Sequence, residues 1–155
     1  MNMRLPCILG AFIALVLLTL SCSTTGEDII DVPINIKNAT DVGAVGFDLV
    51  YNSDVLTATE VSVDDLSRGA EAGYNADTPG RLYIAVQNAP LINGDGILVR
   101  AYFEVVDHAG ISTFTLENIQ ARNGVTLEYV EAQSSGGNFV AADMTITAPV
   151  IDFSK

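Results

Sequence analysis

The chain has 155 residues, of which 19 are acidic and 7 are basic, and its formal net charge at pH 7 is −12. This acidity argues against binding to nucleic acid and against charge-driven adhesion to an anionic membrane. Hydrophobic residues make up 49% of the sequence, so one domain with a substantial buried core is expected.

Residues 1–21 have the pattern of a secretory signal peptide. Arg4 is the only basic residue of this segment, and an uncharged apolar run follows it from about Leu5 to Leu20. The run is short for a bilayer-spanning helix, which needs ~20 apolar residues. We therefore predict that residues 1–21 are removed from the mature chain.

Cys22 follows this run, and the sequence before it resembles a bacterial lipoprotein box. In such a box a small residue, here Ser21, precedes a cysteine that becomes lipidated, although Thr19 stands where Leu is usual. Cys7 would leave with the signal peptide, so Cys22 would have no partner for an intrachain disulfide. We favour lipid attachment at Cys22, which predicts a secreted chain that meets the cell surface or outer membrane only through that anchor. The alternative is cleavage after Ser23, which leaves a soluble secreted protein.

After a short tether, residues 22–26, the sequence alternates between strand and turn patterns and shows no convincing helix. Between Gly43 and Tyr51, for example, Phe47 and Leu49 alternate with smaller or polar residues. Turns are predicted at 38–43 and 90–96 and a loop at 67–80, whereas strands are predicted at 32–36, 44–51, 56–66, 81–88, 97–106, 112–121, 125–132 and 137–142. This spacing predicts an all-β fold, an antiparallel β-sandwich.

No catalytic or metal-binding pattern stands out. The only histidine, His108, lies in a predicted loop, where a lone histidine is typically a solvated turn residue. Asp64 and Asp65 are adjacent, unlike the two carboxylates that a glycosidase holds across a cleft. Residues 93–96 read Asn-Gly-Asp-Gly, which turn formation explains, because the later ligands of a calcium loop are missing. We predict a protein that is not an enzyme and needs no cofactor.

Several segments, taken in order, resemble a cohesin domain. "GEDIIDVPINI" with "VYNSDVL" resembles the front half of that family, and "VSVDDL" resembles the segment that follows it. "GRLYIAV" resembles the family's central strand, "GDGILVRAYFEVV" a later strand, and "QSSGGNFVA" its closing strand. The likeness covers residues 26–141. It implies a jelly-roll sandwich of about nine strands over residues 27–142, related in fold to carbohydrate-binding modules.

The resemblance implies a protein partner, because cohesins in cellulosomes bind calcium-loaded dockerins carried by polysaccharide-degrading enzymes. It also implies a binding face built from the strand that begins at Gly43 and from strands 81–88 and 97–105. The outward residues of this face would be Ala44, Gly46, Asp48, Tyr83, Ala85, Gln87 and Asn88. Ala44 and Gly46 stand where dockerin-binding cohesins tend to carry Asn or Asp, so we expect a flat, lightly charged surface.

Two other functions remain open. A carbohydrate-binding module would present exposed aromatic rings, and Tyr83 and Tyr102 could lie near each other on one sheet and bind a polysaccharide. The chain has no Trp, however, so this platform would be thin. The third possibility is a structural domain of an envelope assembly, which the short tether favours.

Two departures from the cohesin pattern bear on the fold. Asn52 and Ser53 replace an Asp-Pro pair, and Asn52 is expected to make the same local turn bond as an aspartate. The family's first strand is missing, which would leave a sheet edge exposed. We hypothesise that the C-terminal tail, residues 143–155, fills that edge, because Met144 and Ile146 alternate there with threonines.

Overall fold

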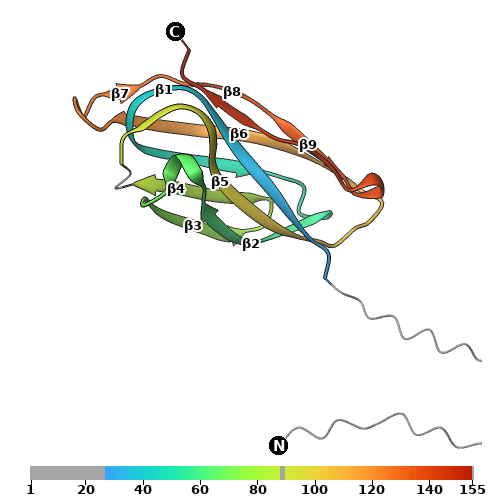
Figure 1. Cartoon of the computed structure of the whole chain (residues 1–155). Helices are drawn as coiled ribbons and strands as arrows, with labels where there is room; N and C mark the ends of the chain where they lie inside the picture. Colours follow the sequence, from blue (N-terminus) through green and yellow to red (C-terminus); the bar gives the residue numbers. More distant parts are fainter. Residues whose placement is uncertain (1–26, 88–89, 155) are drawn as a thin grey trace, which may run out of the picture.

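The computed structural model describes residues 27–87 and 90–154 (Figure 1). The predicted signal peptide, the tether with Cys22, and Asn88 lie outside these residues. The elements, in chain order, are β1 (Ile29–Val50), β2 (Leu56–Val63), the 3-10 helix η1 (Asp65–Ser67), β3 (Glu71–Thr78), β4 (Arg81–Gln87), β5 (Ile92–Val105), β6 (Ile111–Asn123), β7 (Tyr129–Val130), β8 (Gln133–Ser135), β9 (Gly137–Val140), the 3-10 helix η2 (Ala141–Asp143), β10 (Thr145–Thr147) and β11 (Val150–Asp152).

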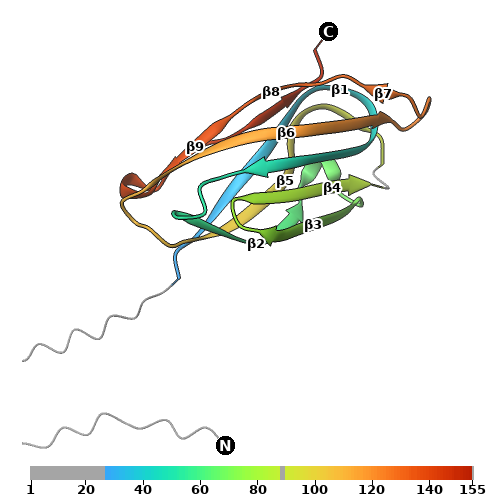
Figure 2. The same cartoon turned by 180° about the vertical axis from the view of Figure 1, so that it is seen from behind.

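β1 is the longest strand, and it belongs to both layers of the sandwich (Figures 1 and 2). Its first part, residues 29–37, pairs with β5 and β11, whereas its second part, residues 42–50, lies between β4 and β6. β2 extends the first layer beyond β5, and β3 extends the second beyond β4. Of the strand pairs in the described residues, all are antiparallel except β1 with β11. The predicted all-β, antiparallel fold class is confirmed.

A bend allows β1 to change layers. Asn38 and Asp41 have left-handed backbone angles there, with φ of 53° and 50°, and the register with β5 shifts between them. Two side chains of β5 accept the backbone N–H groups of these residues. The Asp95 carboxylate accepts from Asn38 at 2.7 Å, and the Asn93 side chain accepts from Asp41 at 2.9 Å. The bend therefore leaves neither donor without a partner.

The bend explains where the predicted turns differ from the structure. Residues 38–43 and 90–96 were each expected to be a turn between strands, but 38–43 lie within β1 and 92–96 within β5, and the two segments pair with one another. Asn, Asp and Gly supply the positive φ values that such irregular strand positions need. Residue types that usually indicate a turn therefore form, in this protein, a bend in β1 that stays paired with β5.

The inner faces of the two layers enclose one apolar core. Phe47 and Leu49 of β1 are fully buried, which confirms the alternation predicted for this strand. The ring of Phe103 packs edge-on against Tyr51, with centroids 4.9 Å apart, and lies 5.9 Å from the ring of Phe114. These contacts join β5 and β6, which belong to different layers, through the middle of the sandwich.

Asn52 ends β1 in the manner expected from the sequence. Its side-chain oxygen accepts the N–H of Asp54 at 3.0 Å, which confirms the predicted turn bond. Its amide nitrogen also donates to the carbonyl of Ile111 at 3.3 Å, and its backbone N–H donates to the hydroxyl of Ser112 at 3.0 Å. An aspartate could not make the amide bond, so Asn52 ties this turn to β6 as well.

Two elements differ from the sequence prediction. The predicted loop 67–80 contains β3, an edge strand that pairs only with β4 and whose exposed, Gly-containing sequence lacks apolar alternation. The hydroxyl of Tyr74 in β3 donates to the carbonyl of Thr59 in β2 at 3.3 Å, which joins the two layers along this side. Conversely, the predicted strand 125–132 is reduced to β7, because the chain folds into a tight turn just before it.

The tail, residues 143–155, forms two short strands. β10 pairs with β9, and β11 lies between β1 and β8. Ile151 is fully buried and Phe153 is 7% exposed. On β1, the N–H of Asn35 donates to the carbonyl of Pro149 and the carbonyl of Lys37 accepts from Phe153, both at 3.0 Å. These contacts bind the end of the chain to the first part of β1.

We expect Ile151→Ala to lower the free energy of unfolding by about 2–5 kcal/mol, because it leaves a cavity in the core. Urea unfolding followed by circular dichroism measures the change. Thr145→Ala, an exposed position of the same tail, serves as the control. Equal stability of the two variants would show that β11 is not integral to the domain.

Candidate functional site

The outward side chains of β3, β4, the second part of β1, and β6 form one surface, here called the four-strand face (Figure 2). Strand register aligns them in rows across the strands. The middle row is made of small residues and one amide: Gly73, Ala85, Gly46 and Gln120. The row on one side contains Asn75, Tyr83, Asp48 and Glu117, and the row on the other contains Ala44, Arg122 and Tyr129.

A shallow groove of about 180 Å³ lies on this face over β4, β1 and β6, and it extends to Tyr129 of β7. It brings together five residues that the sequence placed on the binding face, Ala44, Gly46, Tyr83, Ala85 and Gln87. Asp48 lies in the adjoining row, and Asn88 is outside the described residues. The groove also contains three side chains that were not predicted, Gln120, Arg122 and Tyr129.

Gly46 has a structural role on this face. A Cβ at Gly46 would stand 3.2 Å from the hydroxyl oxygen of Tyr83, which lies in the neighbouring row on β4 and pairs with Asp48. The tyrosine therefore leans over the glycine, and 47% of Tyr83 remains exposed. Gly46 itself offers no side-chain hydrogen bond, but the phenol above it places a polar group at the same point of the surface.

The acidic side chains in the groove's neighbouring row share one arginine partner within the face. Arg81 binds the carboxylates of Asp48 at 2.9 Å and Glu117 at 2.8 Å, and Asn118 donates to Asp48 at 2.7 Å. The hydrogen bond to Glu117, followed by attraction to both carboxylates, raises the pKa of Arg81 above its usual value. Asp48, predicted as a contact residue, is thus already engaged by its own domain.

Arg122 and Tyr129 form the opposite border of the groove. The guanidinium of Arg122 lies 4.5 Å from the ring centroid of Tyr129 and donates to its hydroxyl at 2.7 Å. Alternation along "NIQARN" would have placed Gln120 and Arg122 on the outside of their strand. They were missed because β6 was not assigned to this face.

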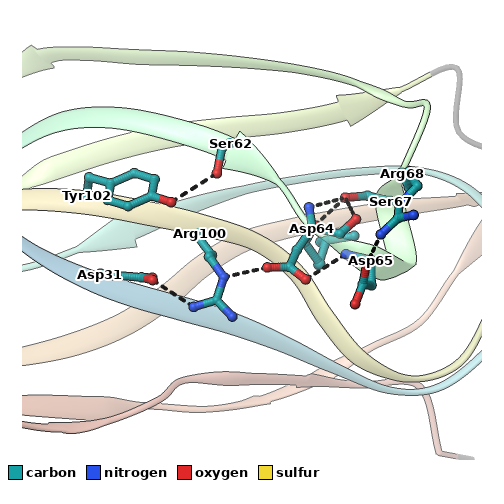
Figure 3. Close-up of polar contacts among 9 residues, drawn as sticks. Asp31, Ser62, Asp64, Asp65, Ser67, Arg68, Arg100 and Tyr102 are labelled. Atoms are coloured by element: carbon teal, nitrogen blue, oxygen red, sulfur yellow. Dashed lines mark hydrogen bonds and ion pairs between the residues drawn. The ribbon is translucent and has the colours of Figure 1, made fainter.

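Residues 97–105 were expected on the same face as strand 81–88 and the strand that begins at Gly43, but they do not lie there. They belong to β5, which pairs with β2 and with the first part of β1 in the other layer. Tyr102 of β5 accepts a hydrogen bond from Ser62 at 3.4 Å (Figure 3). Tyr83 and Tyr102 therefore lie in different layers, and they do not form the two-ring sugar platform considered above.

On the outer surface of this other layer, charged and polar side chains bind one another (Figure 3). Arg100 of β5 binds the carboxylate of Asp31 at 2.7 Å and also that of Asp64. Asp64 caps η1, and Asp65 within η1 pairs with Arg68. Each of the adjacent aspartates is thus bound to an arginine, and the pair of Asp64 with Arg100 links η1 to β5.

His108 lies exposed between β5 and β6, with Nε2 2.9 Å from the carboxylate of Asp28. Within residues 27–87 and 90–154, no group of three or more His, Cys, Asp or Glu side chains is placed to hold a metal ion. The same part of the chain contains no helix long and apolar enough to span a membrane.

The sequence model of the cohesin domain family matches residues 21–132, and the chain belongs to this family. The matched segment ends before β8, so the strands β8 to β11 lie beyond it. A search of curated proteins finds no match.

Solved cohesins share the fold. A non-cellulosomal cohesin from the hyperthermophilic archaeon Archaeoglobus fulgidus is 23% identical, with a TM-score of 0.61 over 81% of this chain and 80% of that chain. CaCohA2 from Clostridium acetobutylicum is 22% identical, with a TM-score of 0.63 over 77% and 84% of the two chains. The Coh-OlpC-Doc435 cohesin–dockerin complex of Clostridium thermocellum gives 12% identity and a TM-score of 0.60 over 81% and 86%. The predicted jelly-roll sandwich is confirmed by these likenesses.

Lowering the pH should reduce the stability of the folded domain because Asp64 becomes protonated. The backbone N–H of Asp65, and then the hydrogen bond from Arg100, lower the pKa of this carboxyl below its ordinary value. Because the pKa of Asp64 is lower in the folded than in the unfolded protein, its ionised carboxylate stabilises the fold at pH values above the unfolded-state pKa of about 4. This stabilisation is lost as the pH falls through the folded-state pKa.

We therefore expect Asp64→Asn to be less stable than the wild type at pH 6 and to lose less stability between pH 4 and pH 2. Urea unfolding at several pH values measures both differences. Asp143→Asn, a surface carboxylate outside the network, is the control. An acid dependence identical in Asp64→Asn and the wild type would contradict this role.

Proposed function

We propose that this chain is a non-catalytic extracellular docking module of cohesin type, which binds a dockerin-like protein through the four-strand face. The observation that carries the proposal is the groove itself, where five residues expected on a cohesin's binding face lie together. Membership of the cohesin family supports the class of function. A structural relative from Clostridium thermocellum is in complex with a dockerin, which supports the class of partner.

The two layers differ in what they offer a partner. On the four-strand face, Gly73 and Ala85 are small, so a partner's side chains can approach the sheet closely there, whereas Tyr83 lies over Gly46. Tyr83 and Tyr129, 47% and 68% exposed, stand on either side as aromatic anchors. The outer surface of the other layer is instead occupied by the Arg100 network.

We further propose that Cys22 is lipidated after removal of residues 1–21. The short tether, residues 22–26, would then hold the module beside the outer surface of the membrane. Its partner would be a secreted protein, linked by the family resemblance to polysaccharide degradation. In a cohesin–dockerin pair the calcium belongs to the dockerin, so this chain would need no metal of its own.

Binding of calcium-loaded dockerins from the same organism, measured by isothermal titration calorimetry, tests the proposal. We expect Ala85→Arg to weaken binding by tenfold or more, about 1.4 kcal/mol, because it fills the middle of the face. Thr57→Arg places the same side chain on the other layer and should bind as the wild type does. Chelation of calcium should abolish dockerin binding by both the wild type and Thr57→Arg.

Undiminished binding by Ala85→Arg would contradict docking on this face. Failure of every calcium-loaded dockerin from that organism to bind the wild type would contradict the dockerin-like partner.

A further inference from the structure

Arg122 stands out among the arginines of the described residues because it has no carboxylate partner there. Arg68, Arg81 and Arg100 each pair with at least one aspartate or glutamate. The contacts of Arg122 within the described residues are both with Tyr129. In a chain with 19 acidic and 7 basic residues, an arginine that pairs with none of the described carboxylates is unusual.

We propose that Arg122 is the specificity-determining residue of the four-strand face and that it binds a carboxylate of the docked protein, an Asp or Glu side chain next to an apolar one. This inference rests on the proposed docking function and adds the chemistry of the partner's contact.

The guanidinium of Arg122 is already oriented for such a contact before a partner binds. Stacking at 4.5 Å on the Tyr129 ring and the 2.7 Å bond to its hydroxyl fix the side chain at the border of the groove. A guanidinium carries five N–H donors, and a carboxylate can accept two of them side by side. Because the side chain is already oriented, less rotamer entropy is lost when the pair forms.

The hairpin that carries Tyr129 is itself well ordered by local bonds. The side-chain oxygen of Asn123 accepts the N–H groups of Val125 at 2.8 Å and Thr126 at 2.9 Å. Gly124 packs so closely against β1 and the segment before β5 that an added Cβ would lie 2.4 Å from a methyl carbon of Leu91. The arginine therefore projects from a fixed support.

Apolar side chains lie at the tip of the same hairpin. Val125 is 64% exposed and Leu127 is 69% exposed. They follow Arg122 in the chain, within the short connection from β6 to β7. This placement favours a partner surface on which an apolar residue adjoins the acidic one.

The geometry favours a protein carboxylate over an acidic sugar. A pyranose stacks on an open aromatic face, but the guanidinium of Arg122 covers one face of Tyr129. Tyr83 leans over Gly46, where its hydroxyl lies 3.2 Å from the position of a Cβ. Both rings thus already contact groups of their own domain, whereas a flat surface with one oriented cation suits a protein.

A display selection tests the inference without a known partner. A yeast-displayed library of a small three-helix scaffold with randomised surface residues is selected for binding to the purified protein and against binding to its Ala85→Arg variant. The surviving binders therefore dock on the four-strand face. We expect them to be enriched in Asp or Glu at a position adjacent to an apolar residue.

We expect Arg122→Gln to lower the affinity of these binders by about tenfold or more, and Arg122→Lys to lower it less. Arg68→Gln, which removes an exposed arginine of η1, should leave affinity unchanged. Exchange of the binder's acidic residue for Arg should restore binding to Arg122→Glu, which a merely structural role of Arg122 would not do. Thermal melting confirms that each variant is folded.

Face-directed binders that lack the acidic residue and bind Arg122→Gln as they bind the wild type would overturn the inference and leave the docking face intact. A selection that yields no binder sensitive to Ala85→Arg would contradict the docking face itself. A third outcome would also overturn the inference: galacturonate oligomers bind only when Arg122 is present, while the selected binders do not depend on Arg122. The arginine would then serve to bind a sugar.

Discussion

The rest of the structure depends on the bend at which β1 leaves one layer and enters the other. Two residues with left-handed backbone, Asn38 and Asp41, turn the strand, and Asp95 and Asn93 of β5 accept their N–H groups. The strand can therefore pair with β5 and β11 before the bend and with β4 and β6 after it. A single chain segment thereby closes the core and supplies the central strand of the four-strand face.

This arrangement gives the two layers different surfaces. Arg100 lies on the outside of the first layer, where it binds Asp31 and Asp64. On the second layer Arg81 pairs with both carboxylates that lie beside the groove. What remains is a nearly flat surface of small and aromatic residues with one oriented cation, Arg122. Such a surface recognises a partner by shape and by one directed polar contact rather than by a charge field.

Local patterns in the sequence predicted much of this correctly, because they depend on neighbours in the chain. Alternation placed Phe47 inside and Ala85 outside, and the chemistry of Asn52 predicted its turn bond. Strand pairing could not be predicted in the same way, because it depends on which part of β1 each strand meets after the bend. For that reason residues 97–105 were assigned to the face in place of β6, and Arg122 was missed.

We propose that a partner covers the four-strand face and leaves the other layer exposed. Chemical-shift mapping by NMR, with the labelled protein titrated by a calcium-loaded dockerin, measures this directly. We predict the largest shifts at Gly46, Ala85, Gln120 and Arg122, in the groove and along its border. Shifts concentrated instead at Thr57, Tyr102 and Glu104, on the outer surface of the other layer, would contradict it.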